Sequence, residues 1–399
     1  MLEYVKLVAL QLRSRKVVRK RDVKGGGTVF GVAKKGTDKV REVWDGSRVS
    51  DSCIPPPKLP MLAIPCSFPR LEVAPGSRLL MSKKDCRCFF DQLALPKAIQ
   101  PFTGRPPILI KELIDICGMT SDEIASFLPD GARARPDDVY YPVSRVWCMG
   151  FAWSSFVAQS TLLYCCRASG LKDSICLCDE RPTPKTCSEA YALATDDVMH
   201  FTTCGPDLAK RRMDALDQAL VDNGIEKHPL KDLLAATDGT CIGVDLSDGQ
   251  FFTAHGPRLA LLLVGVVELI RVGSCSPRQL HAVLGVAQWM CLLNRPLFAS
   301  LDSSYGFTRL VPEHEQRVLG TDVLAELALI IYLAPYFEAD LRRPWSSFLA
   351  ATDASVEFGF GASIAKCTIH VARQVGRLAE TRGAYVRLSR DGGPTDEPE

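Results

Sequence analysis

The stretch that decides the fold is residues 191–200, which read Tyr-Ala-Leu-Ala-Thr-Asp-Asp-Val-Met-His. Apolar residues flank an adjacent acid pair, Asp196 and Asp197, and no Lys or Arg lies close in sequence to neutralise it. Short apolar runs of this kind are typical of buried strands. Two carboxylates at the tip of a buried hairpin repel each other unless a cation lies there. Two interpretations are open: a solvated turn between strands, or part of a metal site.

The composition is that of a globular protein. The 399 residues are enough for two or three domains with a sizeable core, and 47% of them are hydrophobic and 24% charged. The 16 cysteines are too diffuse for a small disulfide scaffold, and no paired CxxC indicates a zinc site. No secretory signal is evident, and the longest apolar runs are too short to cross a bilayer. We expect an intracellular protein, cytoplasmic or nuclear, that does not enter a membrane.

The charge of the chain is uneven although its net value is only +2. Residues 1–45 hold twelve Lys and Arg against five acids. A basic arm of this kind suits a polyanion such as nucleic acid, although many basic N-termini are only soluble tails.

Residues 28–45 follow a glycine run and predict a β-hairpin, with a turn at residues 36–38 and a second strand over residues 40–44. On this hairpin, Lys34 or Lys35 and Arg41 can project to one side and form a phosphate clamp. The alternative is an ordinary solvated hairpin face.

Two further segments have a strand followed by polar or small residues. Residues 79–81 predict a strand with Asp85 at its end and Phe90 five residues later. In residues 145–159, Gly150 follows a strand and precedes an apolar helix that carries Gln159, with Ser154 as its expected N-cap.

The second half of the chain is expected to be largely helical. Residues 207–223 have the apolar spacing of an amphipathic helix, and Asn223-Gly224 ends it. Residues 240–249 predict another hairpin. Residues 258–335 look helical, with one helix opening at Ser276.

In sequence order, these segments resemble the motifs of reverse transcriptases of retroelements, of the DIRS-like type or related ones. The spacing Asp85-x-x-x-x-Phe90 resembles the first carboxylate motif, and residues 194–197, Ala-Thr-Asp-Asp, resemble the second, usually Tyr-x-Asp-Asp. The hairpin over residues 28–45 resembles the fingers, and the segment around Gly150 resembles the motif in which a glycine opens a helix. Each motif alone is weak, but four in the family's order are specific together.

The resemblance implies an α+β chain with the right-hand polymerase fold of fingers, palm and thumb. It implies the following domains: a basic N-terminal arm (1–24), fingers hairpin and linker (25–75), palm (76–246) with an inserted fingers segment (95–144), helical thumb and connection (247–345), and a truncated ribonuclease-H-like start with a tail (346–399). Only 46 residues follow Asp353 in the last segment. We therefore expect no ribonuclease H activity.

The resemblance also implies two-metal nucleotidyl transfer with Mg²⁺ or Mn²⁺. Asp85 and Asp196 would be the bridging metal ligands, and Asp197 a neighbouring catalytic carboxylate that tunes charge or orientation. Lys231, or Lys227, would donate a proton to the leaving pyrophosphate.

The remaining residues that the family pattern identifies would bind the nucleotide. Lys35 and Arg41 would hold the triphosphate, and Phe90 would lie beneath the sugar and exclude a 2′-hydroxyl. Gly150 and Gln159 are the other two residues expected to bind the nucleotide. The partners would be an RNA or DNA template with its primer, and deoxynucleoside triphosphates (dNTPs).

The expected function is therefore an RNA-directed DNA polymerase that adds nucleotides to a primer 3′-hydroxyl. Two departures from the family pattern stand out: Ala194 where a Tyr is usual, and Met149 where a polar residue is usual. Two alternatives are a catalytically inactive nucleic-acid-binding remnant of such a polymerase, and an unrelated α/β protein whose Asp pair is a plain turn.

Overall fold

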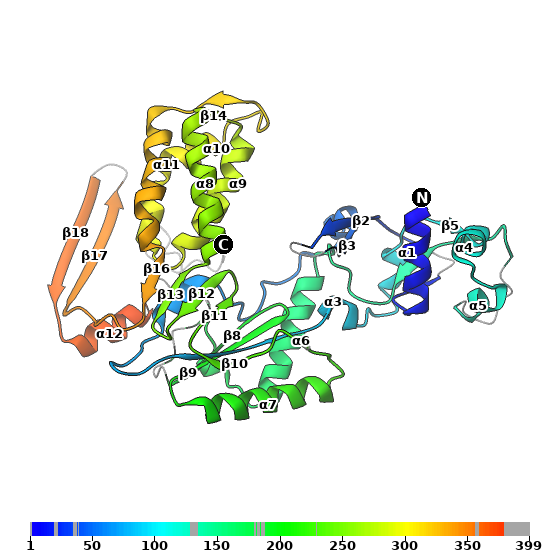
Figure 1. Cartoon of the computed structure of the whole chain (residues 1–399), viewed down its shortest axis with the longest axis horizontal. Coiled ribbons are helices and arrows are strands. Elements are labelled where there is room, and N and C mark those ends of the chain that lie inside the picture. Colours follow the sequence, from blue (N-terminus) through cyan, green and yellow to red (C-terminus); the bar gives the residue numbers. More distant parts are fainter. Residues whose placement is uncertain are drawn as a thin grey trace, which may run out of the picture. The chain divides into compact units, whose positions relative to one another are not determined.

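The computed structural model describes residues 2–19, 23–34, 38, 40–127, 135–178, 181, 184, 188–228, 230–355 and 359–378. The chain divides into two compact units. The first unit consists of Met1–Pro60, Cys86–Cys165 and Ala219–His228, and the second of Met61–Asp85, Cys166–Gln218 and Pro229–Glu399. Helices and strands are mixed in both (Figure 1).

The second unit is built on an antiparallel four-stranded sheet in the order β10-β4-β9-β8. Its strands are β4 (Leu80–Asp85), β8 (Glu189–Ala194), β9 (Asp197–Thr202) and β10 (Leu233–Ala236). The predicted amphipathic helix is present as α7 (Pro206–Asp222), with Met213 and Leu216 buried. Side chains alternate between the two faces of a strand. Every second residue of β4 and β9 therefore points to the face that α7 covers.

The opposite face of this sheet contributes to an apolar core shared with a second antiparallel sheet, β11-β12-β13-β16. Met81, Met199 and Phe201 enter this core from the first sheet, and Phe252 enters from the second. Phe68 stacks on Phe252 at 4.8 Å between ring centroids. The added elements are η1 (Pro65–Arg70), β11 (Gly239–Cys241), β12 (Val244–Ser247), β13 (Phe251–Ala254) and β16 (Glu338–Asp340).

A helical bundle lies between β13 and β16 in the chain and has a core of its own. Ser276 caps α9: its hydroxyl accepts a hydrogen bond from the Gln279 backbone amide, and the Gln279 side chain accepts one from the Ser276 amide. This confirms the predicted start of that helix. The elements are α8 (Gly256–Val272), β14 (Ser274–Cys275), α9 (Pro277–Cys291), η5 (Arg295–Ser300), α10 (Asp302–Thr308), β15 (Arg317–Val318), α11 (Thr321–Leu333) and η6 (Ala334–Tyr336).

The last described elements are a strand pair and a helix. β17 (Phe348–Ser355) pairs antiparallel with β18 (Gly359–Lys366), which places the backbone of Asp353 opposite Gly361. α12 (Ile369–Leu378) follows. Within the described part of the chain, none of the helices has both the length and the apolar character that crossing a bilayer requires.

The first unit contains the predicted hairpin, β2 (Thr28–Ala33) and β3 (Val40–Asp45), with Ala33 opposite Val40. Its other elements are α1 (Leu2–Arg13), β1 (Val17–Arg19), α2 (Ser47–Asp51), α3 (Phe89–Gln92), η2 (Gln100–Phe102), β5 (Ile108–Leu109), α4 (Ile110–Cys117), α5 (Ser121–Ser126), β6 (Val139–Tyr140) and β7 (Pro142–Ser144). α6 (Ser154–Ala168) begins in the first unit and ends in the second.

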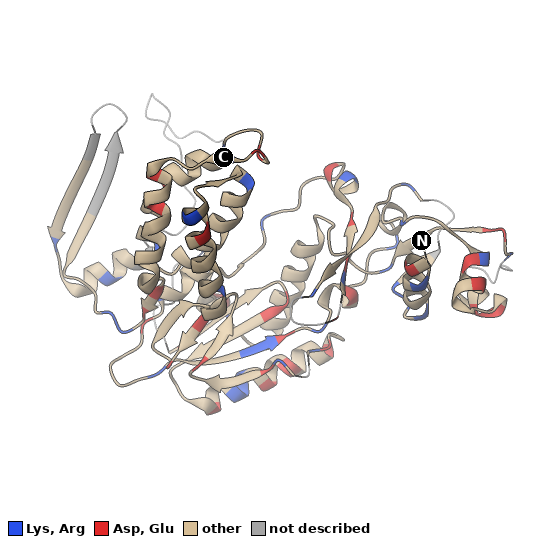
Figure 2. Cartoon of the chain, turned by 45° about the horizontal axis from the view of Figure 1, so that its top comes forward, with Lys and Arg blue, Asp and Glu red and all other residues tan. Residues whose placement is uncertain are grey.

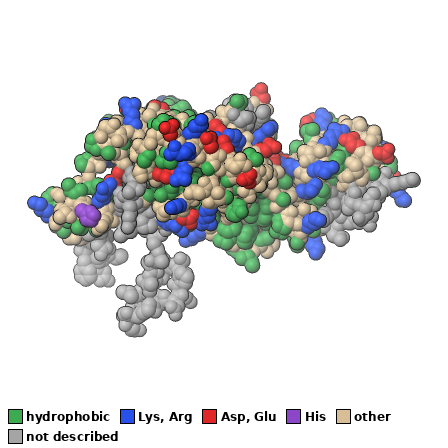
Figure 3. All heavy atoms as spheres, turned by 90° about the horizontal axis from the view of Figure 1, so that it is seen from below, with side chains coloured by type: hydrophobic (Ala, Val, Ile, Leu, Met, Phe, Trp, Pro, Cys, Tyr) green, Lys and Arg blue, Asp and Glu red, His purple; other side chains and the backbone are tan. Residues whose placement is uncertain are grey.

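The basic N-terminal segment is folded rather than a solvated tail. Val5, Val8 and Leu12 of α1 are fully buried. Lys16 forms ion pairs with Glu42 at 3.2 Å and with Asp91 at 2.8 Å. These ion pairs neutralise part of the positive charge of this segment. On the face of the molecule drawn in Figure 3, basic side chains are interspersed with acidic ones.

A buried polar network anchors the β2–β3 hairpin to the first unit. The Arg105 side chain is 1% exposed and bonds Glu42 of β3 at 2.6 Å. Its guanidinium also donates to the Gln11 side-chain oxygen at 2.5 Å and to the Ser144 hydroxyl at 3.0 Å. Removing one partner of a buried ion pair leaves an uncompensated charge in a low-dielectric interior.

We expect Arg105→Ala to lower the free energy of unfolding by about 2–4 kcal/mol, because Gln11 and Ser144 lose a buried hydrogen-bond donor and Glu42 keeps only Lys16 as its cation. Urea denaturation followed by circular dichroism measures this change. Arg48→Ala on the exposed surface of α2 is the matched control and should change stability by less than about 0.5 kcal/mol. Equal effects of the two substitutions would contradict an anchoring role for Arg105.

Candidate active site

Three acids come together at one end of the four-stranded sheet of the second unit. β4 and β9 pair so that Asp85 lies directly opposite Asp197, and opposed residues of an antiparallel pair project to the same face. Asp196 lies in the turn that joins β8 to β9. The sequence placed Asp85 at a strand end and the Asp pair at a hairpin tip, and the pairing brings these two ends together.

Two lysines reach the acids from neighbouring positions. Lys231 Nζ lies 2.6 Å from Asp85 Oδ2, because Lys231 precedes β10 and extends the pairing in which Leu233 lies opposite Lys83. Lys83 shares a face of β4 with Asp85, and its Nζ lies 3.3 Å from Asp197 Oδ2. The basic stretch of β4 is visible within the sheet in Figure 2. The acid pair therefore has a cation from another strand, although none lies close to it in sequence.

The two carboxylates that face each other differ in their surroundings. The Asp85 side chain is 8% exposed and is bound by Lys231. Burial raises the pKa of Asp197 to about 6; the charge of Lys83 opposes this shift, and the charges of Asp196 and Asp85 add to it. Asp197 Oδ1 is buried without a hydrogen-bond partner among the described residues. A buried carboxylate oxygen of this kind is a ready ligand for a hard cation.

The turn that carries Asp196 is strained. Thr195 has a φ of 57°, in the left-handed region that a β-branched residue rarely adopts. The Asp196 amide donates to the Ala194 carbonyl at 2.7 Å, which closes the turn tightly. Strained backbone of this kind is concentrated at functional sites, where it fixes the direction of a side chain.

The opposite face of β4 secures the same region. Lys84 is 7% exposed, and its Nζ lies 2.9 Å from Asp217 of α7 and 2.5 Å from Asp232. Asp232 is the neighbour of Lys231 in sequence. The buried ammonium of Lys84 thus holds the segment that brings Lys231 to Asp85.

The residues expected to bind the nucleotide lie mostly in the first unit. Arg41 is exposed on β3, and Lys35 lies outside the described residues. Phe90 is half-buried in α3, two residues after the left-handed Cys88. The predicted role of each stays a prediction.

Gly150 and Gln159 have structural roles within that unit. Gly150 has a φ of 106°, and a Cβ there would lie 2.1 Å from the Trp44 carbonyl oxygen of β3. This close approach alone requires a glycine. Gln159 is fully buried in α6, and its amide donates to the Pro60 carbonyl at 3.0 Å. Ser154, the expected N-cap, is instead the first residue of α6, and its hydroxyl donates to the Cys148 carbonyl.

No group of three or more His, Cys, Asp or Glu side chains has metal-holding geometry in the described part of the chain. At the acid cluster, Lys231 occupies one Asp85 oxygen, and this engagement competes with a metal ion for the same ligand. The donor set itself, three carboxylates with one orphaned oxygen, suits Mg²⁺ or Mn²⁺. His200 is buried, and its Nε2 forms a hydrogen bond with Glu189 Oε1 at 3.1 Å.

Sequence reasoning missed Lys83, Lys84 and the strain at Thr195. The alternation of side chains in a strand would have placed Lys83 on the face of Asp85 and Lys84 on the other. Nothing in the sequence around Lys84 identifies its partners, because Asp217 and Asp232 are more than 130 residues away.

We expect Asp197→Asn to raise the free energy of unfolding by about 2–3 kcal/mol above pH 6, measured in a chelating buffer. A carboxyl whose folded pKa is raised from its ordinary value to about 6 is equally protonated in both states at low pH. Stability is lost as pH rises from the unfolded to the folded pKa, and Asn removes that loss.

Urea denaturation between pH 4 and pH 8 measures this dependence on pH. Asp214→Asn, at an exposed position of α7, is the control and should leave the pH profile unchanged. If Asp197→Asn left the dependence of the free energy of unfolding on pH unchanged, the Asp197 carboxyl would not be the group that lowers stability as pH rises.

No family model matches the chain, and no curated protein matches its sequence. Among solved structures, it is similar to a foamy viral protease-reverse transcriptase (the dRH form) in complex with double-stranded DNA, with a TM-score of 0.57 and 12% identity over 89% of this chain and 54% of that one. A second foamy viral protease-reverse transcriptase in complex with double-stranded DNA gives a TM-score of 0.53 and 13% identity over 88% and 60%. The chain thus spans little more than half the length of these proteins. At this identity the likeness concerns the fold: the chain has a reverse-transcriptase-like fold.

Proposed function

We propose that the protein is an RNA-directed DNA polymerase of a retroelement, which transfers a nucleotide from a dNTP to the 3′-hydroxyl of a primer. The observation that carries this proposal is the register of β4 and β9, which sets Asp85 opposite Asp197 with Asp196 in the adjoining turn. The reverse-transcriptase-like fold supports the same reaction class. The more specific assignment to a DIRS-like branch rests on the sequence pattern alone.

The acid cluster would hold the catalytic metal ions. Bound Mg²⁺ or Mn²⁺ would stabilise the attacking and leaving oxygens of an in-line displacement at phosphorus. Asp85 and Asp196 are the proposed ligands, and Asp197, with its orphaned oxygen, is the adjoining carboxylate. Lys83 limits the repulsion among these acids through its ion pair with Asp197.

Lys231 is the proposed proton donor to the leaving pyrophosphate. Its hydrogen bond to Asp85 raises its pKa, so it carries a proton at neutral pH. Lys35 and Arg41 are proposed to bind the triphosphate, since an ammonium and a guanidinium fork are complementary to phosphate oxygens. Phe90 would contact the sugar, and Gly150 and Gln159 would shape the nucleotide site through the packing described above.

The parts of the fold take on the following roles in this proposal. The four-stranded sheet with α7 is the palm, the β2–β3 hairpin belongs to the fingers, and the α8–α11 bundle is the thumb. The pair β17–β18 is the opening of a ribonuclease-H-like segment. Template and primer, as RNA or DNA, are the proposed partners.

Primer extension tests the proposal directly. The purified protein is incubated with a primed RNA template, the four dNTPs and Mg²⁺, and the extended primer is resolved by electrophoresis. We expect extension by the wild type and a loss of at least about a hundredfold in Asp196→Ala, because a metal ligand that stabilises developing charge is removed. Asp214→Ala, on the exposed face of α7, is the matched control and should retain full activity.

Two outcomes would contradict the proposal. Extension that Asp196→Ala leaves unchanged would show that the acid cluster is not the catalytic centre. No extension by the wild type, together with RNA binding that weakens steeply with salt, would instead identify a nucleic-acid-binding protein without polymerase activity.

A further inference from the structure

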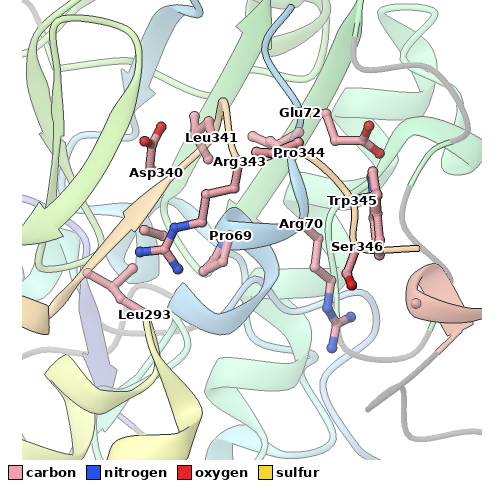
Figure 4. Close-up of a pocket in the computed structure, with 13 residues that line it drawn as sticks. Pro69, Arg70, Glu72, Leu293, Asp340, Leu341, Arg343, Pro344, Trp345 and Ser346 are labelled. Atoms are coloured by element: carbon pink, nitrogen blue, oxygen red, sulfur yellow. The ribbon is translucent and has the colours of Figure 1, made fainter. Parts of the chain in front are cut away.

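A pocket of about 260 Å³ lies in the second unit, away from the acid cluster. The end of η1, the segment that follows β16, and α12 form its walls (Figure 4). Arg70 and Arg343 supply its basic groups, and Trp345 supplies an aromatic wall. Pro69 and Leu293 add apolar surface. In Figure 4, Arg343 and Trp345 lie on opposite sides, with Arg70 between them.

The acids of the pocket lining are both neutralised by arginines from outside it. Asp340 is bound through both oxygens by Arg342, at 2.9 and 3.0 Å. Glu72 is bound by Arg373 of α12, at 3.1 and 2.5 Å. In the described chain, no acid forms an ion pair with Arg343. The charge of Arg343 reaches Asp340 and helps to lower its pKa, after the larger effect of the Arg342 hydrogen bonds, but both Asp340 oxygens are bound by Arg342. The exposed Arg343 guanidinium therefore keeps its hydrogen-bond donors available to a ligand.

The aromatic wall is held in place by α12. A Cβ on Gly376 would lie 2.2 Å from the Trp345 ring, so the helix backbone packs directly against the indole. Ala372, one turn earlier in α12, is 3% exposed. The ion pair between Arg373 and Glu72 fixes the same helix. A ring positioned in this way loses little conformational freedom when a flat group stacks on it.

We propose that this pocket binds a nucleotide unit, with its base against Trp345 and its phosphate at Arg343. An exposed guanidinium and a fixed indole are complementary to a planar aromatic group that carries an anion. The unit is either a free nucleotide or a nucleotide within a single strand. This site is separate from the acid cluster and needs no metal ion.

Binding is measured with the full chain in buffer that contains a chelator, so that metal-dependent binding at the acid cluster does not contribute. Equilibrium dialysis follows radiolabelled deoxyadenosine monophosphate, with inorganic phosphate as competitor, and fluorescence anisotropy follows a labelled oligothymidylate. The measurements are repeated with Asp196→Ala, which separates this site from the proposed polymerase site. Arg343→Gln and Trp345→Leu are the test variants. Arg211→Gln, at an exposed position of α7, is the matched control.

We expect Arg343→Gln to weaken binding about tenfold or more, as loss of a charge-assisted hydrogen bond does, and Arg211→Gln to leave it unchanged. Arg343 is exposed, so its variant should fold even if Trp345→Leu does not. Binding of the monophosphate supports a free nucleotide, and binding of the oligonucleotide alone supports a unit within a strand. No binding of either, equal binding by wild type and Arg343→Gln, or inorganic phosphate binding as tightly as the nucleotide would overturn the proposal.

Discussion

Three carboxylates repel one another at one end of the β10-β4-β9-β8 sheet, and the surrounding structure offsets this repulsion. Asp85 and Asp197 are opposed in register, and Asp196 adjoins them in a strained turn. Left alone, three such charges would disfavour the pairing of β4 with β9. Lys83 and Lys231 offset this repulsion from two neighbouring positions. Burial remains the main reason why the pKa of Asp197 is raised, with the charges of Asp196 and Asp85 adding to it in spite of Lys83.

The strand β4 serves two purposes because its side chains alternate. Lys83 and Asp85 face the acid cluster, whereas Lys84 points to α7 and is buried between Asp217 and Asp232. A buried ammonium is costly unless it is paired, so this triad fixes β4, α7 and the segment before β10 relative to one another. The positions of the acids on one face thus depend on an ion-pair network on the other.

The sequence was sufficient for elements with strong local signals. The β2–β3 hairpin, α7 and the capped start of α9 were all predicted, because alternation, helical periodicity and a capping box are local patterns. Lys84, Arg105 and the close contact of Gly150 with Trp44 were not predicted as structural anchors. Each depends on a partner far away in sequence, which no local pattern reveals. Gly150 illustrates this: the sequence pattern predicts a nucleotide contact, and the structure adds a close backbone contact with Trp44 that no local signal predicted.

The ion pair between Lys231 and Asp85 helps to stabilise the acid cluster in the folded chain. The ammonium supplies a positive charge at an acid that is 8% exposed, while the Lys231 side chain itself is 46% exposed. A pair with one partner this accessible to water contributes only about 0–1 kcal/mol to stability. Lys231 can therefore leave Asp85 at little cost when a divalent cation with a stronger field arrives. In the proposed polymerase, the Asp85 oxygen would then become available to the metal ion.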